Sequence, residues 1–302
     1  MKKFFSQKIK IGNKTINPKS RPFIVAEVSS NHSQDIGRCL KLIEAAKKSG
    51  FDAIKFQAFK VEELFSEEIL RKSPEHLERK KWEFPIEFLP EIRNKCDEVG
   101  IQLGMTPFYL DAVDECLPFL DFFKIASYEI LWSELLEKCS KTGLPLIIST
   151  GMANMEEISS AVKIIENSGC EDLSILHCVS SYPVSDKEVN LSAIKSMSEM
   201  YKWPIGWSDH SRIKGVVISA VLKWDAKIVE MHLDLDGEWE EFGPGHCWLP
   251  SDSKETIEIC KASKLYDGSG KKVPTVSEQD ERLWRADPID GLRPHKSIRS
   301  EF

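Results

Sequence analysis

Eight short apolar runs rich in β-branched residues recur along this chain, and longer stretches with the 3.6-residue period of amphipathic helices lie between them. The runs span residues 23–29, 53–57, 102–106, 122–126, 145–149, 173–177, 205–208 and 227–232. The clearest helical stretches span residues 36–48, 88–99, 155–168, 191–200 and 215–224. Strands alternating with helices predict a parallel sheet, and eight such units predict a closed (β/α)₈, or TIM, barrel.

An open, doubly wound sheet is the alternative fold, and two features argue against it. The first strand is not followed by a Gly-x-Gly-x-x-Gly turn, and the 302 residues suit one barrel, which needs roughly 250. Local signals agree with the helix positions. Gly50, Gly100 and Gly143 are expected to cap helices at their C-termini, and Asn154 with Glu157 predicts a capping box.

The two ends of the chain differ from its middle. Residues 1–265 are predicted to form the catalytic barrel domain, with residues 1–20 as an N-terminal extension. Residues 266–302 are charged and rich in turn-forming residues, so we expect a tail packed on the barrel and no second domain.

Bulk composition limits the possible partners and the compartment. A net charge of −7 argues against nucleic acid or an anionic membrane as the main partner, so an anionic substrate would require locally concentrated cations. The eight cysteines include no C-x-x-C pair, which favours reduced thiols. The basic N-terminus lacks an apolar signal segment, and no apolar run reaches the ~18 residues of a membrane span. We therefore expect a cytoplasmic protein.

Polar or ionisable side chains stand at the end of nearly every predicted strand. In a barrel these ends converge on one mouth, where active sites lie. Unpaired buried charge is costly, so eight coordinated cases indicate a functional site rather than isolated structural groups. The residues are Glu27, Lys55, Gln57, Thr106, Lys124, Ser127, Ser149, Thr150, His177, Ser180, Ser208, Asp209, His210, Glu230 and His232.

Two lysines among these residues, Lys55 and Lys124, point to an anionic substrate. With the hydroxyls of Thr106, Ser127 and Ser208 they suit a phosphate or a carboxylate. Glu27 could serve as a general base or orient a water molecule.

Two histidines at the ends of adjacent strands, His210 and His232, could share a divalent metal ion. Isolated histidines are more often structural than ligating, but the acidic neighbours Asp209 and Glu230 favour the metal because carboxylates orient or supplement imidazole ligands. These residues together predict metal-assisted chemistry on an anionic substrate, without naming the reaction.

At these positions the sequence resembles the sialic acid synthase family, which includes N-acetylneuraminate synthase. The matching stretches follow one another in order over about residues 20–265. They are AEVSSNH (26–32), DAIKFQAFK (52–60), MTPF (105–108), FKIAS (123–127), STGMA (149–153), LHCVSSYP (176–183), GWSDH (206–210), VEMHLDLD (229–236) and GPGH (243–246).

The resemblance implies a metal-dependent condensation of phosphoenolpyruvate with the open-chain aldehyde of an N-acylmannosamine-like sugar. The implied products are a 3-deoxy-2-keto nonulosonic acid and phosphate. It makes His210 and His232 ligands of Mn²⁺ or Mg²⁺, Glu27 a catalytic carboxylate, and Gln57 and Tyr182 sugar-side residues. The implied phosphoenolpyruvate-binding positions are Lys55, Thr106, Lys124, Ser127 and Ser208, and Ser180 is a substrate-binding position where relatives often have Asn. A homo-oligomer, a dimer, is also expected.

The sequence departs from the family pattern in two places. Gly245 stands where the family has an aspartate near the metal and the sugar, and Asp234, Asp236 or Glu241 could replace that acid. Most family members continue into a small antifreeze-like domain that lends an arginine to the partner's sugar site, whereas this sequence ends at about that point. Both differences predict an altered sugar site beside an intact phosphoenolpyruvate site. Either the acceptor is an unusual sugar, or another polypeptide completes the site.

Two other functions stay open. The first is a Schiff-base aldolase that uses Lys55 or Lys124 as nucleophile, which would need no metal. The second is a catalytically silent barrel that acts as a binding subunit. Retention of the histidines, the lysines and Glu27 argues against the silent barrel.

Overall fold

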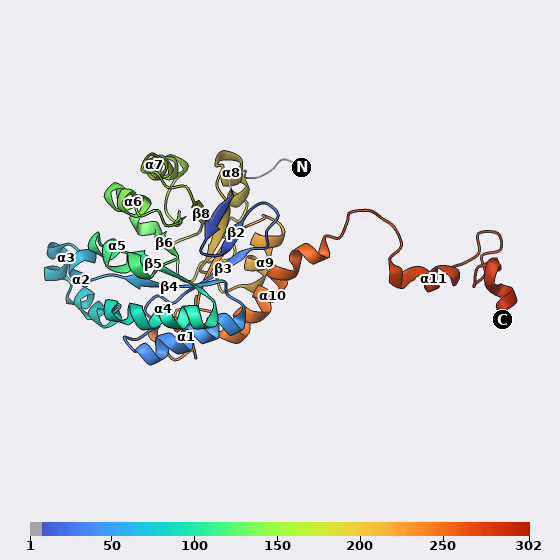
Figure 1. Ribbon diagram of the computed structural model, residues 1–302, viewed down its shortest axis with the longest axis horizontal. Helices are drawn as coiled ribbons and strands as arrows, with labels where there is room; N and C mark the ends of the chain where they lie inside the picture. The colour runs from blue at the N-terminus through green and yellow to red at the C-terminus, as the bar shows by residue number, and fades with distance from the viewer. Residues whose placement is uncertain (1–7) are drawn as a thin grey trace. The chain divides into compact units, whose positions relative to one another are not determined.

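The computed structural model describes residues 8–302, which divide into two compact units (Figure 1). The first unit ends at Ser263, and the second spans Lys264–Phe302. Each unit is described by itself below.

The first unit is a closed barrel of parallel strands in the order β10-β3-β4-β5-β6-β7-β8-β9, which confirms the predicted (β/α)₈ fold. Its strands are β3 (Phe23–Glu27), β4 (Ala53–Ala58), β5 (Gln102–Pro107), β6 (Phe122–Ile125), β7 (Leu146–Ser149), β8 (Leu173–His177), β9 (Ile205–Asp209) and β10 (Ile228–His232). The predicted ranges differ from these bounds by at most two residues at either end. Almost every strand residue is buried, because neighbouring side chains and the surrounding helices cover both faces.

Helices surround the barrel, as the ribbon in Figure 1 shows. The α-helices of the first unit are α1 (Ile36–Ser49), α2 (Val61–Leu64), α3 (Glu67–Lys72), α4 (Leu89–Val99), α5 (Asp111–Cys116), α6 (Ser133–Ser140), α7 (Met155–Asn167), α8 (Ala193–Met200), α9 (Lys214–Leu222) and α10 (Pro250–Tyr266), which crosses into the second unit. Short 3₁₀ helices span Pro74–Trp82, Ile86–Phe88, Leu117–Phe119, Ser127–Glu129 and Glu240–Phe242. Among the helices of residues 8–302, none has the length and apolar character needed to cross a bilayer.

The predicted helix caps are mostly found. Gly50 and Gly100 end α1 and α4 with φ angles of +92° and +70°, a left-handed conformation that glycine adopts without steric cost. Asn154 and Glu157 form the predicted capping box of α7. The cap prediction for Gly143 is wrong, because α6 ends at Ser140 with Lys141 as a right-handed C-cap, and Gly143 lies in the following loop.

An antiparallel hairpin of β1 (Ile9–Ile11) and β2 (Lys14–Ile16) precedes the barrel and was not predicted. Its three isoleucines are buried in the core, and Lys10 N–H donates to Asp172 at the start of β8. Where the structure describes it, the predicted N-terminal extension therefore closes the end of the barrel at which the strands begin. The functional site must lie at the opposite end.

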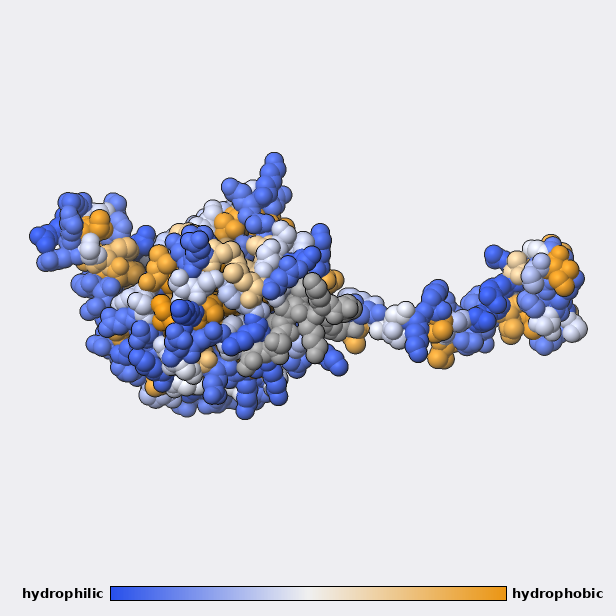
Figure 2. All heavy atoms as spheres, turned by 90° about the horizontal axis from the view of Figure 1, so that it is seen from above, coloured by the Kyte–Doolittle hydropathy of each residue, from blue (hydrophilic) through white to orange (hydrophobic). Residues whose placement is uncertain are grey.

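The second unit contains a short helix, α11 (Gln279–Leu283), and 3₁₀ helices at Val276–Glu278 and Lys296–Glu301. Arg299 pairs with Asp290 at 2.5 Å, and the Trp284 and Phe302 rings lie 5.3 Å apart. Figure 2 shows hydrophobic patches on this unit, which exposes Val276, Leu283, Trp284, Ile289, Leu292 and Phe302. The predicted packing of this segment on the barrel stays a prediction.

Candidate active site at the carboxyl ends of the strands

The register of the barrel brings the polar strand ends to one level. Glu27 on β3 is paired with His232 on β10 and with Lys55 on β4. Gln57 on β4 lies opposite Thr106 on β5. Parallel strands in register place their carboxyl ends on the same rim, so residues far apart in sequence share one site.

A buried charge network occupies the centre of this rim. Lys55 Nζ donates to Thr106 Oγ1 at 2.9 Å and forms an ion pair with Glu27. Glu230 Oε1 lies 3.5 Å from Lys124 Nζ and 3.9 Å from Lys55 Nζ. Both lysine side chains are nearly inaccessible to solvent. Two cations and two carboxylates therefore balance one another here, and Glu230 pairs with the lysines instead of supplementing a metal site.

Burial and charge act in opposite directions on these groups. Burial lowers the pKa of Lys55 to about 7, although the carboxylate of Glu230 raises it. Burial also raises the pKa of Glu230, but the neighbouring Lys124 and Lys55 outweigh burial and hold it below its ordinary value. The site thus contains a carboxylate that stays charged and a lysine that can exchange a proton near neutral pH.

Hydroxyl groups border the lysines on the side of β6 to β9. Ser208 Oγ donates to Glu230 at 3.2 Å, and Ser127 Oγ accepts the Gly151 N–H at 3.0 Å. Ser180 Oγ is buried with no hydrogen-bond partner among the described residues. A Cβ at Gly151 would lie 2.2 Å from Ser180 Oγ, so the missing side chain makes room for these hydroxyls. An unpaired buried hydroxyl on the same rim as the two lysines suits an anion that would satisfy it.

The carboxylate of Glu27 is fixed by short hydrogen bonds. Its Oε1 accepts the Ser29 N–H at 2.6 Å and the Gln57 amide at 3.2 Å. With Lys55 on its other oxygen, this carboxylate has a defined position at the end of β3. Glu27 and Gln57, two of the predicted site residues, therefore contact each other directly.

The predicted histidines lie together at the carboxyl ends of β9 and β10, where His232 neighbours Glu27 on β3. The rings of His210 and His232 are 5.3 Å apart, and the Tyr182 ring packs against His210 at 4.1 Å. His210 Nδ1 contacts the Val179 carbonyl at 2.7 Å, which fixes a proton on Nδ1 and leaves Nε2 as an acceptor. Burial lowers the pKa of both imidazoles, so they are neutral at pH 7, as metal ligands must be.

Asp209 does not orient the imidazoles, contrary to expectation. Its oxygens accept hydrogen bonds from the Trp207 indole at 3.1 Å and the Trp248 indole at 2.9 Å. The Val179 carbonyl performs the orienting function for His210.

Glu129 is a candidate residue that the sequence did not reveal. It follows β6 in the 3₁₀ helix Ser127–Glu129, and its Oε2 is buried without a hydrogen-bond partner. Burial raises the pKa of this carboxyl to about 7, although Lys124 lowers it. In the sequence, only its position two residues after Ser127 pointed to it. Glu129 lies in the 3₁₀ helix after β6 and not at a strand end, so the strand pattern did not include it.

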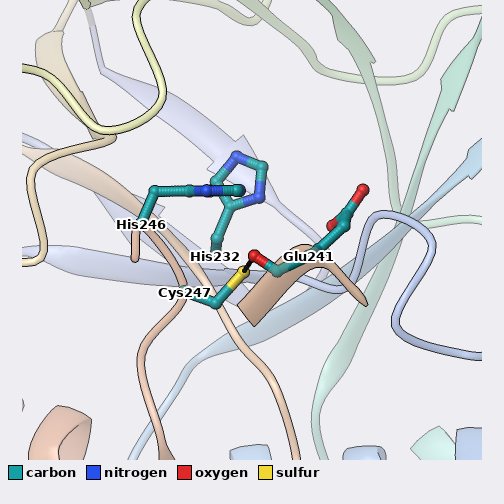
Figure 3. Close-up of side chains that lie close together, drawn as sticks. All are labelled: His232, Glu241, His246 and Cys247. Atoms are coloured by element: carbon teal, nitrogen blue, oxygen red, sulfur yellow. Dashed lines mark hydrogen bonds between the residues drawn. The ribbon is translucent and has the colours of Figure 1, made fainter. Parts of the chain in front are cut away.

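Three acids of the loop after β10 could replace the carboxylate that is absent at Gly245, and their surroundings differ. Asp234 and Asp236 both pair with Arg38, at 2.8 and 2.7 Å, and are therefore engaged. Glu241 lies instead beside His232 and His246 (Figure 3). Gly245 itself has a φ of +98°, so an aspartate there would be strained even though space is available.

Comparison with known proteins extends these observations. The sequence model of the NeuB family matches residues 42–272. The chain belongs to the NeuB family. This confirms the family resemblance seen in the strand-end motifs, all of which lie in the matched part of the chain except the first, at residues 26–32.

Relatives within the NeuB family include named synthases. The chain is 33% identical to the N,N'-diacetyllegionaminic acid synthase of Campylobacter jejuni, over 86% of this chain and 81% of the relative. It is 40% identical to an uncharacterized protein of Methanocaldococcus jannaschii, over 91% of this chain and 80% of that protein. The named synthases among the relatives confirm the prediction of an enzyme.

Solved structures agree with the family assignment. The N-acetylneuraminic acid synthetase of Leptospira borgpetersenii, solved in complex with citrate, superposes with a TM-score of 0.82 at 32% identity. The match covers 91% of this chain and 95% of that protein. A truncated 3-deoxy-D-arabino-heptulosonate 7-phosphate synthase from Thermotoga maritima matches with a TM-score of 0.69 at 16% identity, which shows a shared fold.

Proposed function

We propose that this chain condenses phosphoenolpyruvate with the open-chain aldehyde of an N-acylmannosamine-like sugar. The products are a 3-deoxy-2-keto nonulosonic acid and inorganic phosphate. The single observation that carries the proposal is the buried pair Lys55 and Lys124, ringed by hydroxyls and adjacent to clustered imidazoles. The names of the related sugar-acid synthases support the choice of reaction.

The chemistry balances with water as the third reactant. The methylene carbon of phosphoenolpyruvate forms a bond to the aldehyde carbon, and the aldehyde oxygen takes up a proton. Water adds to the resulting cationic carbon and loses a proton. The carbon–oxygen bond to phosphate then breaks, which leaves the keto group of the product.

The lysine side of the site is the proposed binding place for phosphoenolpyruvate. Lys55 and Lys124 would contact its carboxylate and phosphate, because charge-assisted hydrogen bonds are the strongest that a protein offers. The binding hydroxyls would be Thr106, Ser127, Ser180 and Ser208. An arriving anion would compete with Glu27 and Glu230 for these two cations.

The sugar side is proposed to contain Glu27, Gln57 and Tyr182. Glu27 is held at a fixed position and is the proposed base for the attacking water. Glu129, with its raised pKa, is a second carboxyl that could give a proton to the aldehyde oxygen.

A divalent metal ion fits the imidazole cluster. His210 offers Nε2, and His232 has a buried Nδ1 without a hydrogen-bond partner among the described residues. Such an ion supplies Lewis acidity toward a carbonyl oxygen.

A Schiff-base aldolase is the second candidate, because one observation favours it. Burial lowers the pKa of Lys55 to about 7, and a neutral amine is the nucleophile in Schiff-base formation. The ion pair with Glu27 acts against this function, since it favours the protonated amine. Borohydride distinguishes the candidates: it would inactivate an aldolase irreversibly in the presence of pyruvate and should leave the proposed condensation unaffected.

Replacing Lys55 or Lys124 with methionine tests the proposed binding place. Each change removes a charge-assisted contact worth about 1.5–3 kcal/mol, so affinity for phosphoenolpyruvate should fall by about tenfold or more. Isothermal titration with phosphoenolpyruvate measures the effect.

Lys227→Met is a matched control for these variants. Lys227 is equally buried, but it donates to the Pro18 carbonyl outside the mouth. We expect this variant to lose stability while it keeps its affinity for phosphoenolpyruvate. Near-native affinity in both the Lys55 and the Lys124 variant would show that the anion binds elsewhere.

A further inference from the structure

The loop between β10 and α10 brings a carboxylate and another imidazole to His232. Donor atoms of His232, Glu241, His246 and Cys247 all lie within 4.8 Å of one another. Figure 3 shows the His246 and His232 rings close together, with Glu241 and Cys247 beside them. The sequence predicted neither Glu241 nor His246 as a metal ligand.

Several donor atoms in this cluster lack partners. His232 Nδ1 and His246 Nδ1 are buried and have no hydrogen-bond partner among residues 8–302. The buried Glu241 Oε2 also lacks a well-formed hydrogen bond there, although Ser30 lies near this carboxylate. Glu241 also forms no ion pair with any residue that the structure describes. Buried polar atoms without partners are costly, and a buried carboxylate without a cation is costlier still. One bound cation would satisfy the carboxylate and the imidazoles together.

The loop holds these groups in place from both sides. Ser29 Oγ donates to Glu241 Oε1 at 2.7 Å. Arg38 on α1 pairs with Asp234 at 2.8 Å, and Leu233 forms a β-bridge with Trp248. Groups fixed in this way lose little conformational freedom when an ion binds, which favours tight binding.

Cys247 borders the cluster without being a free ligand. Its thiol donates to the Glu241 carbonyl at 3.4 Å, and its sulfur accepts from the Asn31 amide at 3.7 Å. Two imidazoles and one carboxylate of this cluster are thus left as donors for an ion, beside the Nε2 that His210 offers next to His232.

We propose that His232, Glu241 and His246 are three ligands of one first-row transition-metal ion, which this chain selects over Mg²⁺. Imidazole suits Zn²⁺, Co²⁺ and Fe²⁺, whereas Mg²⁺ prefers oxygen ligands and retains several waters. Two histidines and one carboxylate also leave coordination positions open for a substrate oxygen. The ligand set stands independently of the proposed function. Only the statement that the reaction uses this ion rests on that function.

Cobalt binding to the metal-stripped full chain tests the ligand set without measuring activity. The visible absorption of bound Co²⁺ should saturate at one ion per chain. Glu241→Gln and His246→Asn should each weaken binding by at least about 10- to 100-fold, because loss of even an outer-shell partner of a metal ligand has an effect of that size. A hundredfold excess of Mg²⁺ should not displace the cobalt.

Glu240→Gln is the matched control, because Glu240 is the neighbouring residue and pairs with Lys81 at 2.8 Å, away from the cluster. It should bind Co²⁺ like the native chain. Native affinity in both Glu241→Gln and His246→Asn, with loss in His210→Asn and His232→Asn, would overturn the three-ligand site and leave the proposed function intact. Displacement of cobalt by equimolar Mg²⁺ would overturn the selectivity.

A crystal of the native chain grown with Co²⁺ gives a second measurement of the ligand set. It uses no variant, so misfolding of a variant cannot affect it. Anomalous scattering should place the ion about 2.0–2.2 Å from donor atoms of His232, Glu241 and His246. An ion between His210 and His232 that touches neither Glu241 nor His246 would contradict the proposal. A native chain that binds no metal, yet in chelator releases phosphate from phosphoenolpyruvate only when sugar is present, would refute the site while supporting the condensation.

Discussion

Glu27→Gln should reduce kcat by about 10²- to 10⁴-fold, the usual contribution of a positioned general base or acid. The substitution keeps the size of the side chain and can still accept the Ser29 N–H, so the geometry at the end of β3 should persist. Only the charge and the ability to accept a proton are lost.

The same Glu27→Gln substitution should not weaken the binding of phosphoenolpyruvate. Glu27 now neutralises Lys55, so its removal leaves a more cationic site. Affinity for phosphoenolpyruvate, measured by titration in the absence of sugar, should therefore be unchanged or higher. A kcat within about threefold of the native value would remove Glu27 from the mechanism. A large loss of affinity would instead show that Glu27 supports binding.

Stripping the metal should produce the other large effect. Lewis-acid stabilisation of developing charge is worth several kcal/mol, so turnover should fall by about 10³-fold or more in chelator. Divalent metal should restore the native chain, whereas His232→Asn should not respond. Phosphate release is the measurement, and thermal melting shows whether the variant is folded.

His177→Asn is the matched control for the metal experiment. His177 also ends a barrel strand, but its Nε2 contacts the Val189 carbonyl at 3.0 Å, and it is not one of the clustered imidazoles. This variant should keep the native response to metal. Full activity of the native chain after exhaustive chelation would contradict any function for the imidazole cluster in a metal-dependent reaction.

The strand ends were predictable because barrel geometry fixes them. Once eight parallel strands are recognised, the register determines that Glu27, Lys55 and His232 meet, however far apart they lie in sequence. The same reasoning found Thr106 beside Lys55. The strand periodicity of the sequence is therefore enough to predict which strand-end residues meet at the mouth of the barrel.

Loop residues were not predictable in the same way. Glu241 and His246 reach the site because Arg38, some 200 residues earlier, holds the loop through Asp234. The environment of Asp209 depends on Trp248, which is 39 residues away. Such contacts leave no periodic pattern in the sequence, so an acid near the imidazoles was expected but could not be chosen among Asp234, Asp236 and Glu241.

The central claim is that carbon–carbon bond formation releases phosphate with cleavage of the carbon–oxygen bond. Phosphoenolpyruvate labelled with ¹⁸O in the bridging position tests it directly, when incubated with the metal-loaded chain and a panel of N-acylmannosamine-like sugars. The expected result is inorganic phosphate that retains the label, released only when sugar is present and in equal amount to a new 2-keto acid. Unlabelled phosphate, or phosphate released without sugar, would contradict the account.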